Sequence, residues 1–154
     1  MADADQVRQA ARAALEQLQG RASPAEVQAA KLLVEKLRDQ RDHELMGPLA
    51  EAVSRREPKD AKNRRLYAQY LIDTGKASAA VDLLQPLLKR LAKDDPEWAE
   101  AAGLLGRAFK QIYFDAADKS EAYAREALKQ AIAAYRAPFE ASGNPWHGIN
   151  LVAL

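Results

Sequence analysis

The side chains best suited to catalysis in this sequence are two histidines and a serine that closely precedes the second of them. Ser142 lies five residues before His147, and a serine beside a histidine is the arrangement of a nucleophile with its general base. The serine lacks the Gly-x-Ser-x-Gly sequence that exposes such a nucleophile on a sharp turn. His43 has no second histidine near it, so it does not indicate a metal site. We therefore expect no catalytic residue and no enzymatic activity.

Composition excludes further classes of site. The chain of 154 residues contains no cysteine, which excludes disulfides, thiolate nucleophiles and cysteine-bound zinc or iron–sulfur centres. The 23 lysines and arginines nearly balance the 22 aspartates and glutamates, for a formal net charge of +1. Such a balance argues against bulk electrostatic binding of nucleic acid or of an anionic membrane. We expect a protein or peptide as the partner, and neither a cofactor nor a metal.

The start of the chain bears on its location. The first ten residues, MADADQVRQA, lack the basic start and apolar centre of a signal peptide. No apolar run reaches the length of about 18 residues that a membrane-spanning helix needs. These observations predict a cytoplasmic protein.

Helix-forming residues dominate the sequence, and its apolar residues recur three and four positions apart. Ser23, Pro24 and Glu26 form a capping box with proline at the first helical position, which predicts a helix start. Glycine and proline fall mostly between the helical stretches, as at residues 73–76 and 142–145. These patterns predict an all-α fold of about seven helices plus a short C-terminal helix.

A 38-residue repeat relates these helices to one another. Ala30, Ala68 and Gly106 are separated by 38 residues each time. The larger residues three positions later keep the same spacing: Leu33, Leu71 and Phe109. A small side chain lets two antiparallel helices pack closely, and a larger neighbour fills the groove beside the contact. A fixed period of this length with two helices per unit is typical of a helical solenoid.

Prolines follow the same repeat. Pro48 and Pro86 differ by 38 residues, and each falls within a predicted helix, where proline removes a backbone hydrogen bond and bends the helix. The alternative is that each proline begins its helix. Pro138 is the third copy of this position, displaced by roughly fourteen extra residues around 114–127.

Residues 66–88 resemble a tetratricopeptide repeat (TPR), with Ala68 at the small position, Gly75 at the turn and Ala80 at the contact point of the second helix. The resemblance implies a right-handed α-solenoid of helix hairpins. It divides the chain into an N-terminal capping helix at 1–22 and a TPR-like domain at 23–154. The implied units are about 24–58, 59–96 and 97–145, with a partial fourth unit at 146–154.

The C-terminal half is similar to the TPR-containing TRAF-binding region of apoptosis-signal-regulating kinases and its bacterial relatives. Residues 106–110 match the Gly-Arg-x-x-Lys helix that these proteins carry, although Gln111 stands where they have an acid. Residues 148–150 match the Gly-Ile-Asn segment that opens their next repeat. This resemblance implies a regulatory module that binds other proteins.

The TPR resemblance also implies a binding surface, because the first helix of each TPR hairpin lines the concave groove. Six partner-binding side chains are expected from this register and from the last helix: Lys31, Arg65, Gln69, Arg107, Lys110 and Asn150. The first, third and fourth of them directly follow a small residue, Arg65 lies three residues before Ala68, and Lys110 lies four after Gly106. The basic members suit an acidic peptide or a C-terminal carboxylate, since arginine offers two parallel hydrogen bonds and lysine a point charge. The alternative is that these are ordinary solvated helix residues.

We therefore predict a non-catalytic, regulatory interaction module that captures a partner segment in its concave groove. The alternative is a structural domain that forms a homodimer or docks on the rest of a longer protein. That alternative rests on apolar side chains that the last segment leaves with little cover: Trp146, Ile149, Leu151, Val152 and Leu154.

Overall fold

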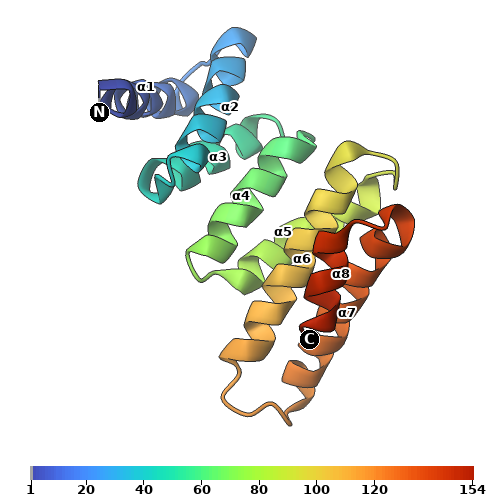
Figure 1. Cartoon of the computed structure of the whole chain (residues 1–154). Coiled ribbons are helices and arrows are strands. Elements are labelled where there is room, and N and C mark those ends of the chain that lie inside the picture. Colours follow the sequence, from blue (N-terminus) through green and yellow to red (C-terminus); the bar gives the residue numbers. More distant parts are fainter. Residues whose placement is uncertain (1) are drawn as a thin grey trace. The chain divides into compact units, whose positions relative to one another are not determined.

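The computed structural model describes residues 2–154, and every regular element within that range is a helix (Figure 1). The eight helices of this range are α1 (Ala2–Gln19), α2 (Pro24–Asp39), α3 (His43–Arg56), α4 (Ala61–Asp73), α5 (Ala77–Arg90), α6 (Pro96–Asp115), α7 (Ala122–Ser142) and α8 (Pro145–Val152). The prediction of an all-α protein with seven helices and a short C-terminal one is confirmed.

Local sequence signals set several helix ends. At the start of α2 the Ser23 hydroxyl accepts a hydrogen bond from the Glu26 N–H at 3.3 Å, and the Glu26 carboxylate accepts one from the Ser23 N–H at 2.7 Å. Short polar side chains also cap three later helices: Asp42 at α3, Asp95 at α6 and Asn144 at α8. Gly143 ends α7 with φ of 65°, a left-handed conformation that favours glycine. The capping box predicted from the sequence is therefore present.

The chain forms two compact units, one reaching to Tyr70 and the other comprising Leu71–Leu154. In the first unit, α1, α2 and α3 pack against one another, and Leu66 of α4 joins their buried core. In the second unit, α6 packs against α5 and α7, and α8 packs against α7. The division into a capping helix at 1–22 and repeat units from residue 23 stays a prediction.

The small residues that define the repeat are all buried. Ala30 and Ala68 have no exposed surface, and Gly106 is buried in α6. A Cβ atom built on Gly106 would lie 2.9 Å from three ring atoms of Tyr135, which projects from α7. The absence of a side chain at Gly106 is therefore what lets α6 and the ring of Tyr135 come so close.

The prolines of the repeat lie inside helices. Pro48 is within α3, Pro86 within α5 and Pro138 within α7. The alternative that Pro48 and Pro86 begin their helices is therefore wrong. Each helix continues past its proline, although proline has no backbone N–H and one helical hydrogen bond is therefore absent.

The extra residues of the third hairpin lengthen both of its helices. Helix α6 has 20 residues against 13 in α4, and α7 has 21 against 14 in α5. At the far end of this longer hairpin, Phe114 and Tyr123 are 55% and 52% exposed. The insertion therefore extends the α6–α7 pair and leaves two aromatic side chains half in solvent.

Candidate functional site

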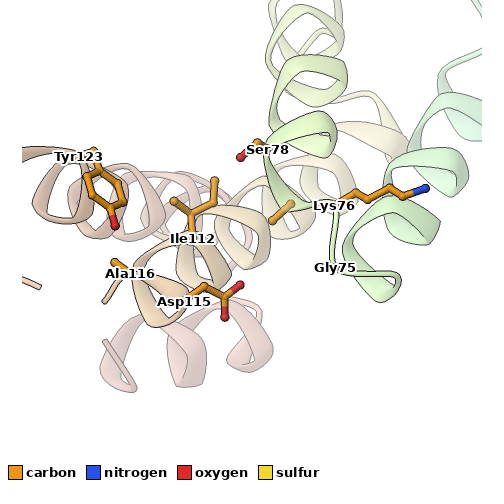
Figure 2. A pocket seen from close by; sticks show the side chains of 8 residues that line it. Gly75, Lys76, Ser78, Ile112, Asp115, Ala116 and Tyr123 are labelled. Carbon is orange, nitrogen blue, oxygen red and sulfur yellow. The ribbon is translucent and has the colours of Figure 1, made fainter. Parts of the chain in front are cut away.

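A shallow pocket of about 380 Å³ lies within the second unit, beside the far end of the α6–α7 hairpin. Figure 2 shows its lining: the turn before α5 contributes Gly75 to Ser78, and the longer hairpin contributes Ile112, Asp115, Ala116 and Tyr123. The Lys76 side chain points away from Tyr123 in this view. The Tyr123 hydroxyl, the Asp115 carboxylate and an apolar wall could hold a small polar group, but no nucleophile is paired with a base here.

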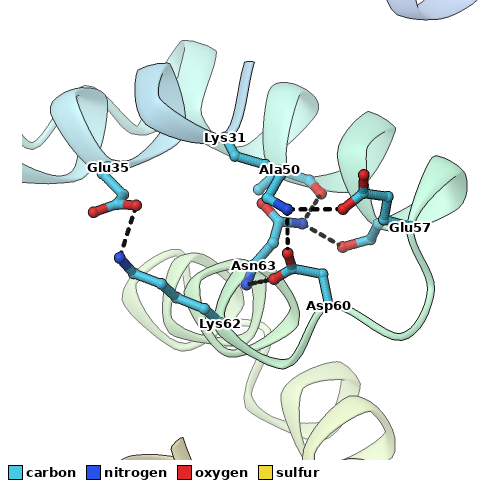
Figure 3. Close-up of polar contacts among 8 residues, drawn as sticks. Lys31, Glu35, Ala50, Glu57, Asp60, Lys62 and Asn63 are labelled. Carbon is cyan, nitrogen blue, oxygen red and sulfur yellow. Dashed lines mark hydrogen bonds and ion pairs between the residues drawn. The ribbon is translucent and has the colours of Figure 1, made fainter. Parts of the chain in front are cut away.

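In the first unit, the predicted site residue Lys31 is held by two acidic side chains (Figure 3). Its ammonium group donates to the Glu57 carboxylate at 2.8 Å and forms an ion pair with Asp60 at 2.5 Å. These hydrogen bonds to Asp60 and Glu57 outweigh burial and raise the pKa of Lys31. Lys31 is therefore a structural cation that joins α2 to the segment between α3 and α4.

The carboxylate of Asp60 is stabilised from several sides. Burial by itself would raise the pKa of Asp60, but the hydrogen bonds from Lys31 and from the Asn63 N–H, with the charges of Lys31 and Lys62, lower it overall. The Asn63 side chain is buried and donates to the Ala50 carbonyl at 2.9 Å and to the Ser54 hydroxyl at 2.8 Å. This polar cluster fixes the start of α4 on α3.

Two further predicted site residues lie on α4. Arg65 is buried, with 9% of its surface exposed, whereas Gln69 is partly exposed. The part of Arg65 in partner binding stays a prediction, made for a residue that the structure buries. Spacing along the helix had placed it on the same face as Ala68, and that face is buried at both positions.

In the second unit, the remaining three predicted residues make specific contacts. Arg107 donates to the Asp73 carboxylate at 2.7 Å, and its side chain keeps 43% of its surface exposed. The Lys110 ammonium donates to the Asn150 side-chain oxygen at 3.1 Å and lies 5.8 Å from the centre of the Tyr135 ring. The structure thus brings Lys110 and Asn150 together across α6 and α8.

Helix α8 lies against α6 and α7, and glycines permit the contact (Figure 1). A Cβ atom on Gly103 of α6 would lie 2.7 Å from the Trp146 ring, and one on Gly148 of α8 would lie 2.8 Å from the Phe139 ring. Between them His147 is only 4% exposed, and its Nδ1 atom is buried without a hydrogen-bond partner. Burial lowers the pKa of His147, although the charge of Glu100 acts to raise it.

This burial makes the docking of α8 sensitive to acid. Because the pKa of His147 is lower in the folded state than its ordinary value of 6.5, undocked α8 binds a proton more readily. We expect docking to be strongest above pH 6.5 and to weaken as pH falls from there toward the folded pKa. The fluorescence of Trp146 reports the docking of α8, since the centre of its ring lies 4.9 Å from that of His147.

The measurement is Trp146 fluorescence against pH in a Trp98→Phe background, because this tryptophan is the second of two in the chain. A matched His147→Gln variant should lose the transition. A transition of the same midpoint in that variant would show that another group is responsible.

The outer face of α7 carries a second shallow groove, of about 360 Å³. Its lining comes entirely from α7: Arg125, Leu128, Lys129, Ile132, Ala133 and Arg136. None of the six predicted site residues lies on this face, although its spacing of three and four residues is visible in the sequence. The TPR resemblance implies a site on the first helix of each hairpin, whereas α7 is the second helix of its hairpin.

No group of three or more side chains of the metal-binding types is placed to hold a metal ion within residues 2–154. No helix of the same residues is long and apolar enough to cross a membrane.

The family of the chain follows from comparison with known protein families. The family model described as Tetratricopeptide Repeats-Sensor (TPR-S) matches residues 28–154. The chain belongs to the TPR-S family. Comparison with curated proteins and with solved structures finds no match. TPR-type domains are in general repeat modules for protein interaction, so the coarse prediction of a TPR domain is confirmed.

Membership in the TPR-S family bears on α8 as well, because the matched region runs through the last helix. Of the apolar side chains expected to have little cover, Trp146, Ile149 and Val152 are exposed, at 50%, 69% and 88%. The other two, Leu151 and Leu154, are partly buried. The six partner-binding residues and the cytoplasmic location stay predictions.

Proposed function

We propose that this TPR-S domain is a regulatory module that binds an acidic segment of a partner protein through the first helices of its hairpins. The observation that carries the proposal is the family match together with the placement of all six predicted residues on α2, α4, α6 and α8. The likeness of residues 106–110 and 148–150 to the TRAF-binding region of apoptosis-signal-regulating kinases supports a regulatory role.

Arg107 is the central contact of this proposal. Its pairing with Asp73 shows that the guanidinium is already oriented to hold a carboxylate, and its side chain is 43% exposed. A partner carboxylate would replace Asp73 on Arg107, at a small cost because such exposed ion pairs contribute little stability. Lys31 is less available, because two acidic side chains hold it and 80% of its surface is covered, leaving 20% exposed.

The test compares partners captured by the purified domain and by its Arg107→Glu/Lys110→Glu variant, each confirmed by titration with the purified partner. We expect binding to fall at least about tenfold in the variant, since two charge contacts become repulsive. Asp73→Asn, which frees Arg107 from its pair, should bind the same partner more tightly. An affinity unchanged in both variants would contradict the proposal.

The second candidate function is self-association through α8. Its support is the row of exposed apolar side chains at Trp146, Ile149 and Val152, three residues apart on one face of the helix. Residues 141–154 carry no charged side chain, so two copies of this face would meet without like-charge repulsion. Sedimentation equilibrium distinguishes the two candidate functions. A dimer that the Ile149→Asp variant dissociates would support self-association through α8. A monomer at high concentration would oppose it.

A further inference from the structure

The outer face of α7 displays three cationic side chains around an apolar strip. Arg125, Lys129 and Arg136 are exposed, while Leu128 and Ile132 between them are half-buried. The row covers about 16 Å, since a helix rises about 1.5 Å per residue. Together these residues line the groove of about 360 Å³ on this helix. The face is thus long, narrow, basic at its edges and apolar at its centre.

These cations have no partners among residues 2–154. No ion pair, hydrogen bond or ring contact involves the side chain of Arg125, Lys129 or Arg136 in that part of the chain. The cations predicted from the sequence differ in this respect, because Lys31 pairs with two acids and Arg107 with Asp73. The groove on α7 therefore carries three cations whose side chains have no partner within residues 2–154.

Two features of these charges are by themselves unfavourable for α7, although Glu121, Glu126 and Glu140 lie three or four residues from the cations. Arg125 lies in the first helical turn, which contains no acidic residue, and a cation there opposes the helix dipole. Arg125 and Lys129 are also four residues apart, where like charges on a helix repel each other. Charged residues at positions that are unfavourable for their own helix are expected at binding surfaces, where contacts with a partner offset the loss of stability.

We propose that this face of α7 binds an acidic amphipathic segment of a partner protein. The apolar side chains of that segment would cover Leu128 and Ile132, and its carboxylates would pair with Arg125, Lys129 and Arg136. The three cations favour an anionic partner by charge complementarity. The apolar side chains between them favour a partner with exposed aliphatic groups. Because the cations extend over three helical turns, an elongated segment fits this face better than a small anion does. The surface lies on the second helix of its hairpin, so it adds a contact to those of the proposed function.

The probe is a panel of fluorescein-labelled synthetic peptides, each with two leucines four residues apart and glutamates on the flanking positions. We expect saturable binding to the full chain by fluorescence anisotropy, weakened by added salt because exposed charges are screened. The Arg125→Glu/Lys129→Glu/Arg136→Glu variant should bind at least about tenfold more weakly. Ile132→Ala should also weaken binding, and peptides with glutamine in place of glutamate should not bind.

The matched control is Arg12→Glu/Lys59→Glu/Lys93→Glu, which makes the same change in net charge at exposed positions away from α7. It should bind as the unmodified chain does, and circular dichroism should show both variants folded. Equal losses in both variants would mean bulk attraction and overturn the proposal. So would an absence of peptide binding, or tight binding to phosphatidylserine vesicles that displaces the peptide.

The same titration separates this proposal from the proposed function. Arg107→Glu/Lys110→Glu should leave peptide binding to α7 unchanged. If that variant abolished it, the peptide would be occupying the α6 site and the proposal for α7 would fail.

Discussion

Replacing Gly106 with valine is expected to lower the stability of the protein by about 2 kcal/mol, the middle of the range for overpacked cores. A Cβ at this position would already lie 2.9 Å from the Tyr135 ring, and valine adds two methyl groups beyond it. Tyr135 is 1% exposed, so neighbouring side chains enclose its ring, and this burial raises the pKa of its hydroxyl to about 12. Helix α7 must therefore shift away from α6.

Thermal unfolding followed by circular dichroism measures this effect. For a chain of this size, a loss of about 2 kcal/mol lowers the melting temperature by roughly 4–8 °C. Gly20→Val is the matched control, because a Cβ there would meet only the Gln17 carbonyl, at 3.7 Å. Equal melting temperatures for the two variants would show that the close approach of α6 and Tyr135 is not required.

The Gly106 contact was predictable because it depends on a small residue at a fixed interval. Short-range signals of the same kind were also reliable: the capping box at Ser23 and Glu26 forms as expected. The prolines lie inside helices because their repeat places them within apolar periodic segments, and the rest of each helix tolerates the missing N–H. Local chemistry and periodicity therefore fixed the fold class.

Charge pairing was not predictable from the same patterns. Lys31 meets Glu57 and Asp60, which lie more than 25 residues away in sequence, because the segment between α3 and α4 passes beside α2. Helical spacing tells which residues share a face, and it does not tell which side chains another segment brings to that face. The burial of Arg65, in contrast, agrees with helical spacing, since Arg65 lies three residues before the buried Ala68.

The α7 face was missed for a different reason. Its pattern is fully visible in the sequence, with Arg125, Lys129 and Arg136 spaced along one helix face. The TPR resemblance directed attention to the first helix of each hairpin, and the structure alone shows that these three cations stay unpaired within residues 2–154. The binding surface that the TPR resemblance implies lies on the first helices, so it does not include α7.

Replacing Lys31 with methionine is expected to destabilise the protein by about 1–3 kcal/mol at pH 7, because the variant leaves two carboxylates without their cation. The loss of the cation beside Asp60 costs more stability than the loss beside Glu57, since the Asp60 side chain is 16% exposed and that of Glu57 is 35% exposed. Methionine keeps the apolar stem of lysine, so the change removes charge and hydrogen bonds more than packing. Urea unfolding at pH 7 measures the loss.

The dependence of this loss on pH tests its cause. The lowered pKa of Asp60 contributes stability that is present above its ordinary value of 3.8 and is lost as pH falls through the folded pKa. Without Lys31, burial should raise the pKa of Asp60, so the variant gains a proton earlier and needs no cation once protonated. The difference between the two proteins should therefore begin to shrink above pH 3.8, where the variant gains its proton, and shrink further as pH falls to the lowered pKa of Asp60 in the unmodified chain.

Lys62→Met is the matched control for Lys31→Met. Lys62 pairs with Glu35 at 2.8 Å, but the two side chains are 48% and 32% exposed. Such exposed pairs contribute at most about 1 kcal/mol. If the two variants lost equal stability, with no dependence on pH, the cluster around Asp60 would be an ordinary surface ion pair. A larger loss for Lys31→Met that fades in acid would instead identify Lys31 as part of the structural cluster around Asp60.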